Sequence, residues 1–185
     1  QQTLMELFIE KVENPEIIYG VCDSPPPLSK WRGCIEYGEE DWAEWVVHCN
    51  TANDVDEIVL VSRDLRGGIQ LEWLPETTTL CWMSHNLLSG RISLESLPGS
   101  LEYLLLDNNA FSGPVDLTKL PPAMRHLELQ KNHLAGEADF SKLPQSLTRF
   151  NMSSNQELSG NLLVQPWQEA YICHFTKVKK YSSLV

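Results

Sequence analysis

A ladder of four Leu-Pro steps, spaced by 23 residues, constrains this chain more than any other feature. The steps begin at Leu74, Leu97, Leu120 and Leu143. Asparagine returns at the same interval at Asn86, Asn109, Asn132 and Asn155. A fixed period of this length indicates stacked supersecondary units, each of which buries its apolar face only against its neighbours. The sequence therefore predicts a solenoid over residues 55–164.

Within one period, the spacing Leu101-x-x-Leu104-x-Leu106 predicts a short strand with one buried face. The asparagine that follows lies at the turn out of the strand, where its amide can satisfy buried backbone groups. This pattern resembles the leucine-rich repeat. The resemblance implies an α/β repeat solenoid of about five coils, with a parallel sheet on its concave face and a helical N-terminal cap. The 23-residue Leu-Pro repeats are most similar to those of unicellular eukaryotes, whose partners are diverse.

The N-terminal segment precedes the repeats and differs from them. Thr3 and Glu6 fit a capping box and predict a helix over residues 3–13. Residues 14–33 are expected to form a Pro-rich loop, and alternation over 45–49 predicts a short strand. This order resembles the N-terminal cap of plant-type leucine-rich repeat proteins, although the usual glycine before the valine is absent. The expected organisation is a cap at 1–54, five coils at 55–164 ending in a strand at 147–153, and a C-terminal cap or tail at 165–185.

Charge and composition exclude several classes of function. The 185-residue chain carries a net charge of −11 and no stripe of clustered Lys and Arg, which argues against nucleic acid. It has no apolar run of the ~20 residues that span a bilayer, so direct membrane insertion by this segment is not expected. No C-x-x-C pair or phosphate-cradling glycine loop is present, and we expect no metal and no cofactor.

Five cysteines leave at least one unpaired. Cys81 takes an inward strand position, which predicts a buried free thiol. The resemblance to the plant-type cap implies a disulfide between Cys34 and Cys49, and the alternative is two reduced, buried cysteines. If the disulfide forms, it indicates the oxidising environment of a secreted or membrane-associated protein. The pairing of Cys22 and Cys173 stays open.

The outward strand positions form a platform on which a partner can bind. The predicted partner-binding residues are Val59, Leu80, Trp82, Tyr103 and Leu105, with His126, Glu128 and Arg149 as a polar rim. Large apolar side chains exposed together mark an interaction site, and Trp and Tyr are typical anchors. The sequence thus predicts a non-enzymatic module that binds a protein or peptide on its concave face. The alternative is that the cap folds over part of this patch.

Catalysis and a structural role are two other classes of function. His85, Asp107 and His126 lie on adjacent coils, but no nucleophile with an oxyanion-hole turn accompanies them, so they are interpreted as solvated polar residues. A structural subunit of a large assembly would contact its neighbours through the cap and the convex loops. A receptor ectodomain fragment would show an oxidised Cys34–Cys49 pair and a partner confined to the concave face.

Overall fold

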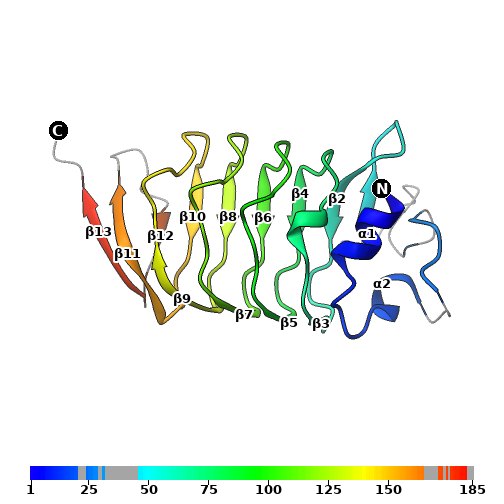
Figure 1. Cartoon of the computed structure of the whole chain (residues 1–185), viewed down its shortest axis with the longest axis horizontal. Helices are drawn as coiled ribbons and strands as arrows, with labels where there is room; N and C mark the ends of the chain where they lie inside the picture. The colour runs from blue at the N-terminus through cyan, green and yellow to red at the C-terminus, as the bar shows by residue number, and fades with distance from the viewer. Residues whose placement is uncertain are drawn as a thin grey trace, which may run out of the picture.

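The computed structural model describes residues 1–20, 24–28, 31, 46–164, 171–172, 174 and 176–182. These residues wind into a β-solenoid whose coils add strands to two sheets (Figure 1). The seven-stranded sheet contains, in spatial order, β1 (Val46–Cys49), β2 (Val55–Val59), β4 (Leu80–Trp82), β6 (Tyr103–Leu105), β8 (His126–Glu128), β10 (Arg149–Asn151) and β12 (Tyr171–Ile172). We call its outward side the strand face.

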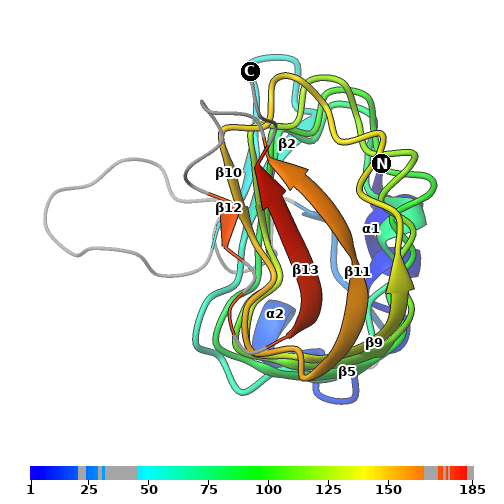
Figure 2. The ribbon, with the colours of Figure 1, turned by 90° about the vertical axis from the view of Figure 1, so that its left-hand side faces the viewer.

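The six-stranded sheet forms a second wall of the solenoid, which the end-on view separates from the first (Figure 2). Its strands, in order, are β3 (Arg66–Gly67), β5 (Leu87–Gly90), β7 (Ala110–Gly113), β9 (His133–Ala138), β11 (Glu157–Val164) and β13 (Lys177–Ser182). All its neighbouring strands run parallel. The sequence pattern predicted only the first sheet. The second sheet forms because the segments after the asparagine turns stack coil on coil and satisfy one another's backbone groups.

The inward strand positions build one continuous core, as the strand periodicity predicted. Successive coils align Ile58, Cys81, Leu104, Leu127 and Phe150 as direct partners across the seven-stranded sheet. Every one of these side chains has no exposed surface. Because each coil covers the apolar face of the next, the core runs along the solenoid axis.

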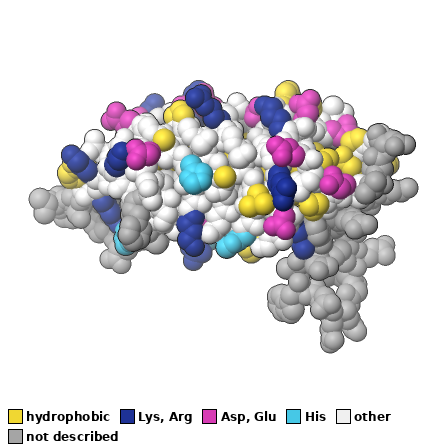
Figure 3. Space-filling view, turned by 90° about the horizontal axis from the view of Figure 1, so that it is seen from below, with side chains coloured by type: hydrophobic (Ala, Val, Ile, Leu, Met, Phe, Trp, Pro, Cys, Tyr) yellow, Lys and Arg dark blue, Asp and Glu magenta, His cyan; other side chains and the backbone are white. Residues whose placement is uncertain are grey.

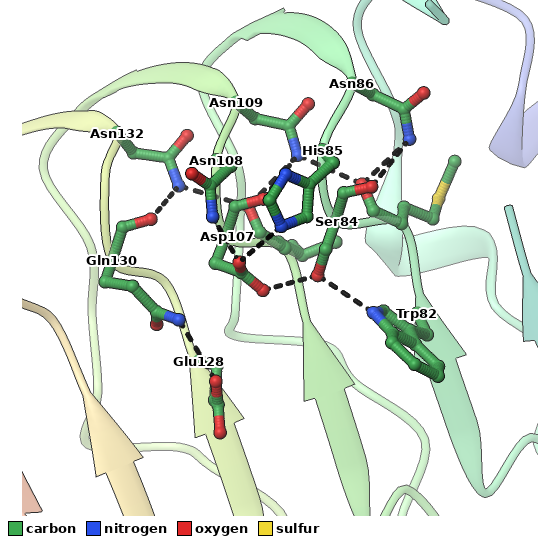
Figure 4. A network of polar contacts seen from close by, with 12 residues as sticks. Trp82, Ser84, His85, Asn86, Asp107, Asn108, Asn109, Glu128, Gln130 and Asn132 are labelled. Atoms are coloured by element: carbon green, nitrogen blue, oxygen red, sulfur yellow. Dashed lines mark hydrogen bonds and ion pairs between the residues drawn. The ribbon is translucent and has the colours of Figure 1, made fainter. Parts of the chain in front are cut away.

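The asparagine ladder satisfies the backbone where each strand ends, as predicted. Asn109 donates from Nδ2 to the carbonyl oxygens of Met83 at 3.0 Å and Leu106 at 3.1 Å. Its Oδ1 accepts from the Leu88 amide at 3.1 Å. Asn86 and Asn132 make equivalent bonds one coil before and one coil after it (Figure 4). Each amide therefore joins its own coil to the preceding one.

The first helix of the N-terminal cap differs from its prediction in two ways. Helix α1 (Gln2–Phe8) begins after Gln1 without a side-chain cap, so the expected capping box of Thr3 and Glu6 does not form. The helix also ends well before residue 13. Residues 11–13 instead bond to the first coil, since Glu13 N donates to Arg66 O at 2.9 Å and Gly68 N donates to Lys11 O at 2.8 Å.

Two short elements complete this end of the solenoid. Helix α2 (Glu16–Tyr19) lies in the stretch expected to be loop. The 3-10 turn η2 (Leu71–Trp73) belongs to the first coil and packs against α1. The predicted strand before the repeats is confirmed as β1, which pairs antiparallel with β2 and aligns Val46 with Val59. This part of the cap therefore extends the sheet instead of folding over it.

The solenoid continues past the last strand that the sequence predicted. Strand β12 pairs in parallel with β10, and β13 pairs in parallel with β11 over Ser159–Val164. The expectation that the strand at 147–153 is the last one is therefore wrong. Residues 171–172 and 177–182 carry no Leu-Pro step, and they become strands because β10 and β11 each offer them an open edge.

Candidate functional site

The eight predicted partner-binding residues lie together on the strand face. Parallel pairing aligns them in two rows that cross the strands. The first row is Glu57, Leu80, Tyr103, His126 and Arg149, and the second row is Val59, Trp82, Leu105, Glu128 and Asn151. Successive members of a row are ~5 Å apart, as adjacent strands are, so their side chains form one surface. The rows exist because a 23-residue period returns each coil to the same register.

The apolar part of this surface spans β2, β4 and β6. Trp82 is the most open of its members, with 39% of the residue exposed. The other four members are half-buried and lie beside it in the two rows: Val59, Leu80, Tyr103 and Leu105. We call these five residues the apolar patch. Its side chains form one contiguous hydrophobic surface, in which each exposed side chain adjoins another apolar one.

The polar part lies on β8 and β10. His126 packs its ring edge-on to Tyr103, with ring centroids 4.9 Å apart and an interplanar angle of 82°. Partial burial is the main cause that lowers the pKa of His126 below 6.5, and the nearby Arg149 lowers it further. The imidazole is therefore neutral near pH 7. Arg149 is exposed and reaches Glu128 with Nη1 at 3.5 Å from Oε1.

A hydrogen-bonded network adjoins the exposed tryptophan just beyond the end of β4 (Figure 4). Trp82 Nε1 donates to Ser84 Oγ at 3.0 Å, and the Ser84 hydroxyl donates to Asp107 Oδ1. The other carboxylate oxygen accepts from Asn108 Nδ2 at 2.5 Å. Asp107 is only 8% exposed, so these donors replace water around its charge. The network fixes the orientation of the indole.

Sequence reasoning missed this supporting role of Ser84 and Asn108. A signal was present, because Ser84 and Asp107 occupy equivalent positions in consecutive coils and 23 residues separate them. Two residues after Trp82, a hydroxyl thus faces a carboxylate across the stack. The sequence could not show that this pair holds the indole, because that role depends on the direction in which the Trp82 side chain points.

The same residues include a serine, a histidine and an aspartate, yet their arrangement differs from a nucleophilic triad. In such a triad the serine donates to histidine, and the aspartate orients the histidine from behind. Here Ser84 donates directly to Asp107, while His85 Nε2 lies 3.8 Å from Asp107 Oδ2. His126 contacts Tyr103 in another row. Ser84 thus holds the carboxylate in place and donates to it in place of a histidine, unlike the serine of a triad.

Two further predictions concern metals and thiols. Within the described ranges, no three His, Cys, Asp or Glu side chains group in a way that could hold a metal ion. Cys81 is fully buried, and that burial raises the pKa of its thiol to about 12, as expected for an inert core cysteine. Cys34 lies outside the described residues, as do Cys22 and Cys173, so the Cys34–Cys49 disulfide stays a prediction.

Seen from below, the surface of the solenoid mixes charges of both signs (Figure 3). Hydrophobic side chains on this view are more numerous toward the N-terminal coils. None of the helices in the described part of the chain has the length and hydrophobicity needed to cross a bilayer.

Three solved structures are similar to this chain over most of its length. The leucine-rich repeat ectodomain of SOBIR1 from Arabidopsis thaliana is 20% identical, with a TM-score of 0.60 over 98% of this chain and 95% of that chain. The BIR2 ectodomain from the same plant is 19% identical, with a TM-score of 0.62 over 95% of this chain and 92% of that chain. Pollen Receptor Kinase 3 is 18% identical, with a TM-score of 0.57 over 100% of this chain and 98% of that chain.

The predicted leucine-rich repeat fold is thereby confirmed: the chain is a leucine-rich repeat β-solenoid. No family profile matches the sequence, and no curated protein matches it. The similarity of the repeats to those of unicellular eukaryotes stays a prediction.

Proposed function

We propose that this protein is a non-enzymatic interaction module that binds a protein or peptide partner on the strand face. The observation that carries the proposal is the apolar patch, whose five side chains occupy adjacent register positions on three consecutive coils. Trp82 and Tyr103 are its anchors. Aromatic side chains that are open to solvent within a contiguous apolar surface are enriched at binding sites.

The hydrogen-bonded network beside Trp82 supports the same proposal. A side chain that is already fixed in the free protein loses little rotamer entropy when a partner covers it, which is worth ~0.5–1.5 kcal/mol for an immobilised side chain. The Ser84 hydroxyl and the Asp107 carboxylate supply this fixation. The indole is thus pre-organised for binding in the free protein.

The charged residues at the two ends of the first row give the surface a direction. Glu57 stands at one end of the first row and Arg149 at the other, and both are exposed. A partner with complementary charges would dock in one orientation along the solenoid axis, because charges at the rim act mainly on orientation and association rate.

A receptor ectodomain is the context that the structural neighbours favour, since SOBIR1 and BIR2 are described as such. We infer an extracellular or secreted location on this basis, with Cys34 and Cys49 oxidised. The competing proposal is an assembly subunit that uses the cap and convex loops, for which reduced cysteines would be the first sign.

Two matched tryptophans allow a direct test. Trp73 on η2 is 38% exposed, nearly the same as Trp82, but it lies outside the strand face. A photo-crosslinking amino acid is placed at Tyr103, and cross-linked proteins are identified by mass spectrometry in extracts of the source organism. Trp82→Ala should lower the yield of the specific product by about 30-fold, the effect of losing ~2 kcal/mol at a binding anchor. Trp73→Ala should leave the yield unchanged.

Circular dichroism and urea titration of each variant keep the result interpretable. If Trp82→Ala and Tyr103→Ala unfold the protein, these side chains belong to the core and the assignment of the outward slots is wrong. If both variants fold and Trp82→Ala still gives the same cross-linking yield as Trp73→Ala, the strand face is not the binding surface.

A further inference from the structure

The two ends of the six-stranded sheet differ in how their backbone is satisfied. At the N-terminal end, Val12 forms a bridge to Gly67, so the cap segment covers the edge of β3. At the C-terminal end, β13 is the outermost strand and pairs in parallel with β11 over six residues, Lys177–Ser182. Among the described residues, no strand pairs with its outer edge, which faces the viewer in Figure 2. Such an edge displays a row of amide and carbonyl groups that can pair with another strand.

This edge is basic, although the whole chain carries a net charge of −11. Lys177, Lys179 and Lys180 are all exposed on β13. Lys177 and Lys179 align with Ser159 and Asn161 of β11, and they therefore project to the same side of the sheet. Lys177 contacts Glu157 of β11, a side chain that is itself exposed. The strand thus concentrates positive charge at one end of an acidic solenoid.

Two exposed apolar side chains adjoin these lysines. Leu163 on β11 is 59% exposed, Tyr181 on β13 is 49% exposed, and the two are direct partners in the parallel register. They lie on the same side of the sheet as Lys177 and Lys179, because residues two apart in a strand share a face. The outward pattern of β13 is therefore Lys-x-Lys-x-Tyr.

Charge decides between the possible occupants of this edge. Pairing with β13 of a second copy would bring two sets of three lysines together, and like charges opposite one another destabilise a strand pair. Lysines at an edge protect against self-association for this reason. The same charges attract an acidic strand. We propose that the outer edge of β13 accepts an extended acidic segment of a partner protein by strand addition. This surface is separate from the strand face.

The register specifies the chemistry of that segment. Two acidic residues spaced by two would face Lys177 and Lys179, and an apolar residue two positions further would lie beside Tyr181, whose other neighbour is Leu163. Backbone hydrogen bonds would supply affinity that does not depend on sequence, while the alternate side chains would supply specificity. In the parallel orientation of the sheet, the segment reads acid-x-acid-x-apolar.

Three labelled peptides test the proposal by fluorescence anisotropy with the full chain. The first has the sequence Thr-Glu-Val-Glu-Val-Leu-Thr, the second replaces both glutamates with lysine, and the third is the first with N-methylated backbone amides. We expect the first peptide to bind, and hydrogen exchange to slow at residues 177–182. The lysine peptide and the N-methylated peptide should not bind, because one lacks the charge and the other lacks the donors.

Charge-reversed variants of the protein complete the test. The double variant K177E/K179E should weaken binding of the acidic peptide by about tenfold or more, since two favourable pairs become two repulsive ones. The single variants K177E and K179E are each compared with K142E, which reverses one exposed loop lysine and should leave binding unchanged.

Several outcomes would overturn the proposal. If no peptide binds, the lysines only protect the edge. If the N-methylated peptide binds as well as its parent, the attraction is electrostatic and no strand is added. Equal loss of affinity in K142E would show that overall charge is responsible. A concentration-dependent dimer with protected β13 amides would identify a second copy as the occupant.

Discussion

Replacing Gly67 with alanine tests how the cap is joined to the first coil. Gly67 and Gly90 take equivalent positions in consecutive coils, and their φ angles are +84° and +86°. What differs is the space around them. A Cβ at Gly90 would meet nothing within 4 Å, whereas a Cβ at Gly67 would lie 2.2 Å from the Lys11 carbonyl oxygen.

The cost of each substitution follows from these surroundings. Each substitution should lower the free energy of unfolding by ~1–2 kcal/mol, because alanine must adopt a left-handed backbone conformation. Gly67→Ala must also push residues 11–13 away from β3. That movement breaks the bonds from Glu13 N to Arg66 O and from Gly68 N to Lys11 O. At ~0.5–1.5 kcal/mol for each bond, Gly67→Ala should cost about 1–3 kcal/mol more than Gly90→Ala.

Urea denaturation followed by far-ultraviolet circular dichroism measures both free energies of unfolding. Limited proteolysis provides a second measure, because a cap released from β3 should be cleaved faster in Gly67→Ala than in Gly90→Ala. Equal destabilisation by the two variants, within about 0.5 kcal/mol, would refute the reasoning, since the contact with Lys11 would then contribute nothing.

Three further predictions concern the ladder, the rim and the cap. Asn109→Ala should lower the free energy of unfolding, measured in urea, by about 2–4 kcal/mol, because buried backbone groups lose their partners. Asn161→Ala at an exposed position should lower it by less than about 0.5 kcal/mol. Similar values for the two variants would contradict the role of the asparagine ladder. The pKa of His126 is lowered on folding, so its contribution to stability is complete above pH 6.5 and is lost as the pH falls toward the lowered value. His126→Gln should therefore make the decrease in Tm between about pH 7 and pH 5 smaller than in the unmodified protein. An equal decrease in both proteins would show that His126 does not contribute to this pH dependence. Alkylation without reduction, read by mass spectrometry, should find Cys34 and Cys49 joined; free thiols at both positions would favour the assembly subunit.

Repetition explains how much of the fold and of the candidate site the sequence predicted. A side chain in one coil contacts its equivalents 23 residues away, and those equivalents can be read directly from the sequence. The inward slots, the asparagine turns and the two outward rows therefore followed from a single period. Trp82 and Leu105 became neighbours as soon as the register was known.

Where the period stops, the sequence alone no longer determines the structure. Residues 171–172 and 177–182 have no repeat signature, and they are strands because the preceding coil presents unpaired backbone groups that they satisfy. Residues 11–13 continue an amphipathic pattern, yet they leave the helix to bond with β3. The second sheet arises in the same way, from stacking and not from local propensity.

The sequence by itself determined the coil, its register and which side chains face outward, because these depend on contacts between equivalent positions. Only the tertiary structure decided how the ends are built and how Trp82 is held. Its indole turns toward Ser84 because the buried Asp107 of the next coil orients that hydroxyl. Such an orientation depends on three side chains from two coils at once, and the periodicity of a sequence does not encode it.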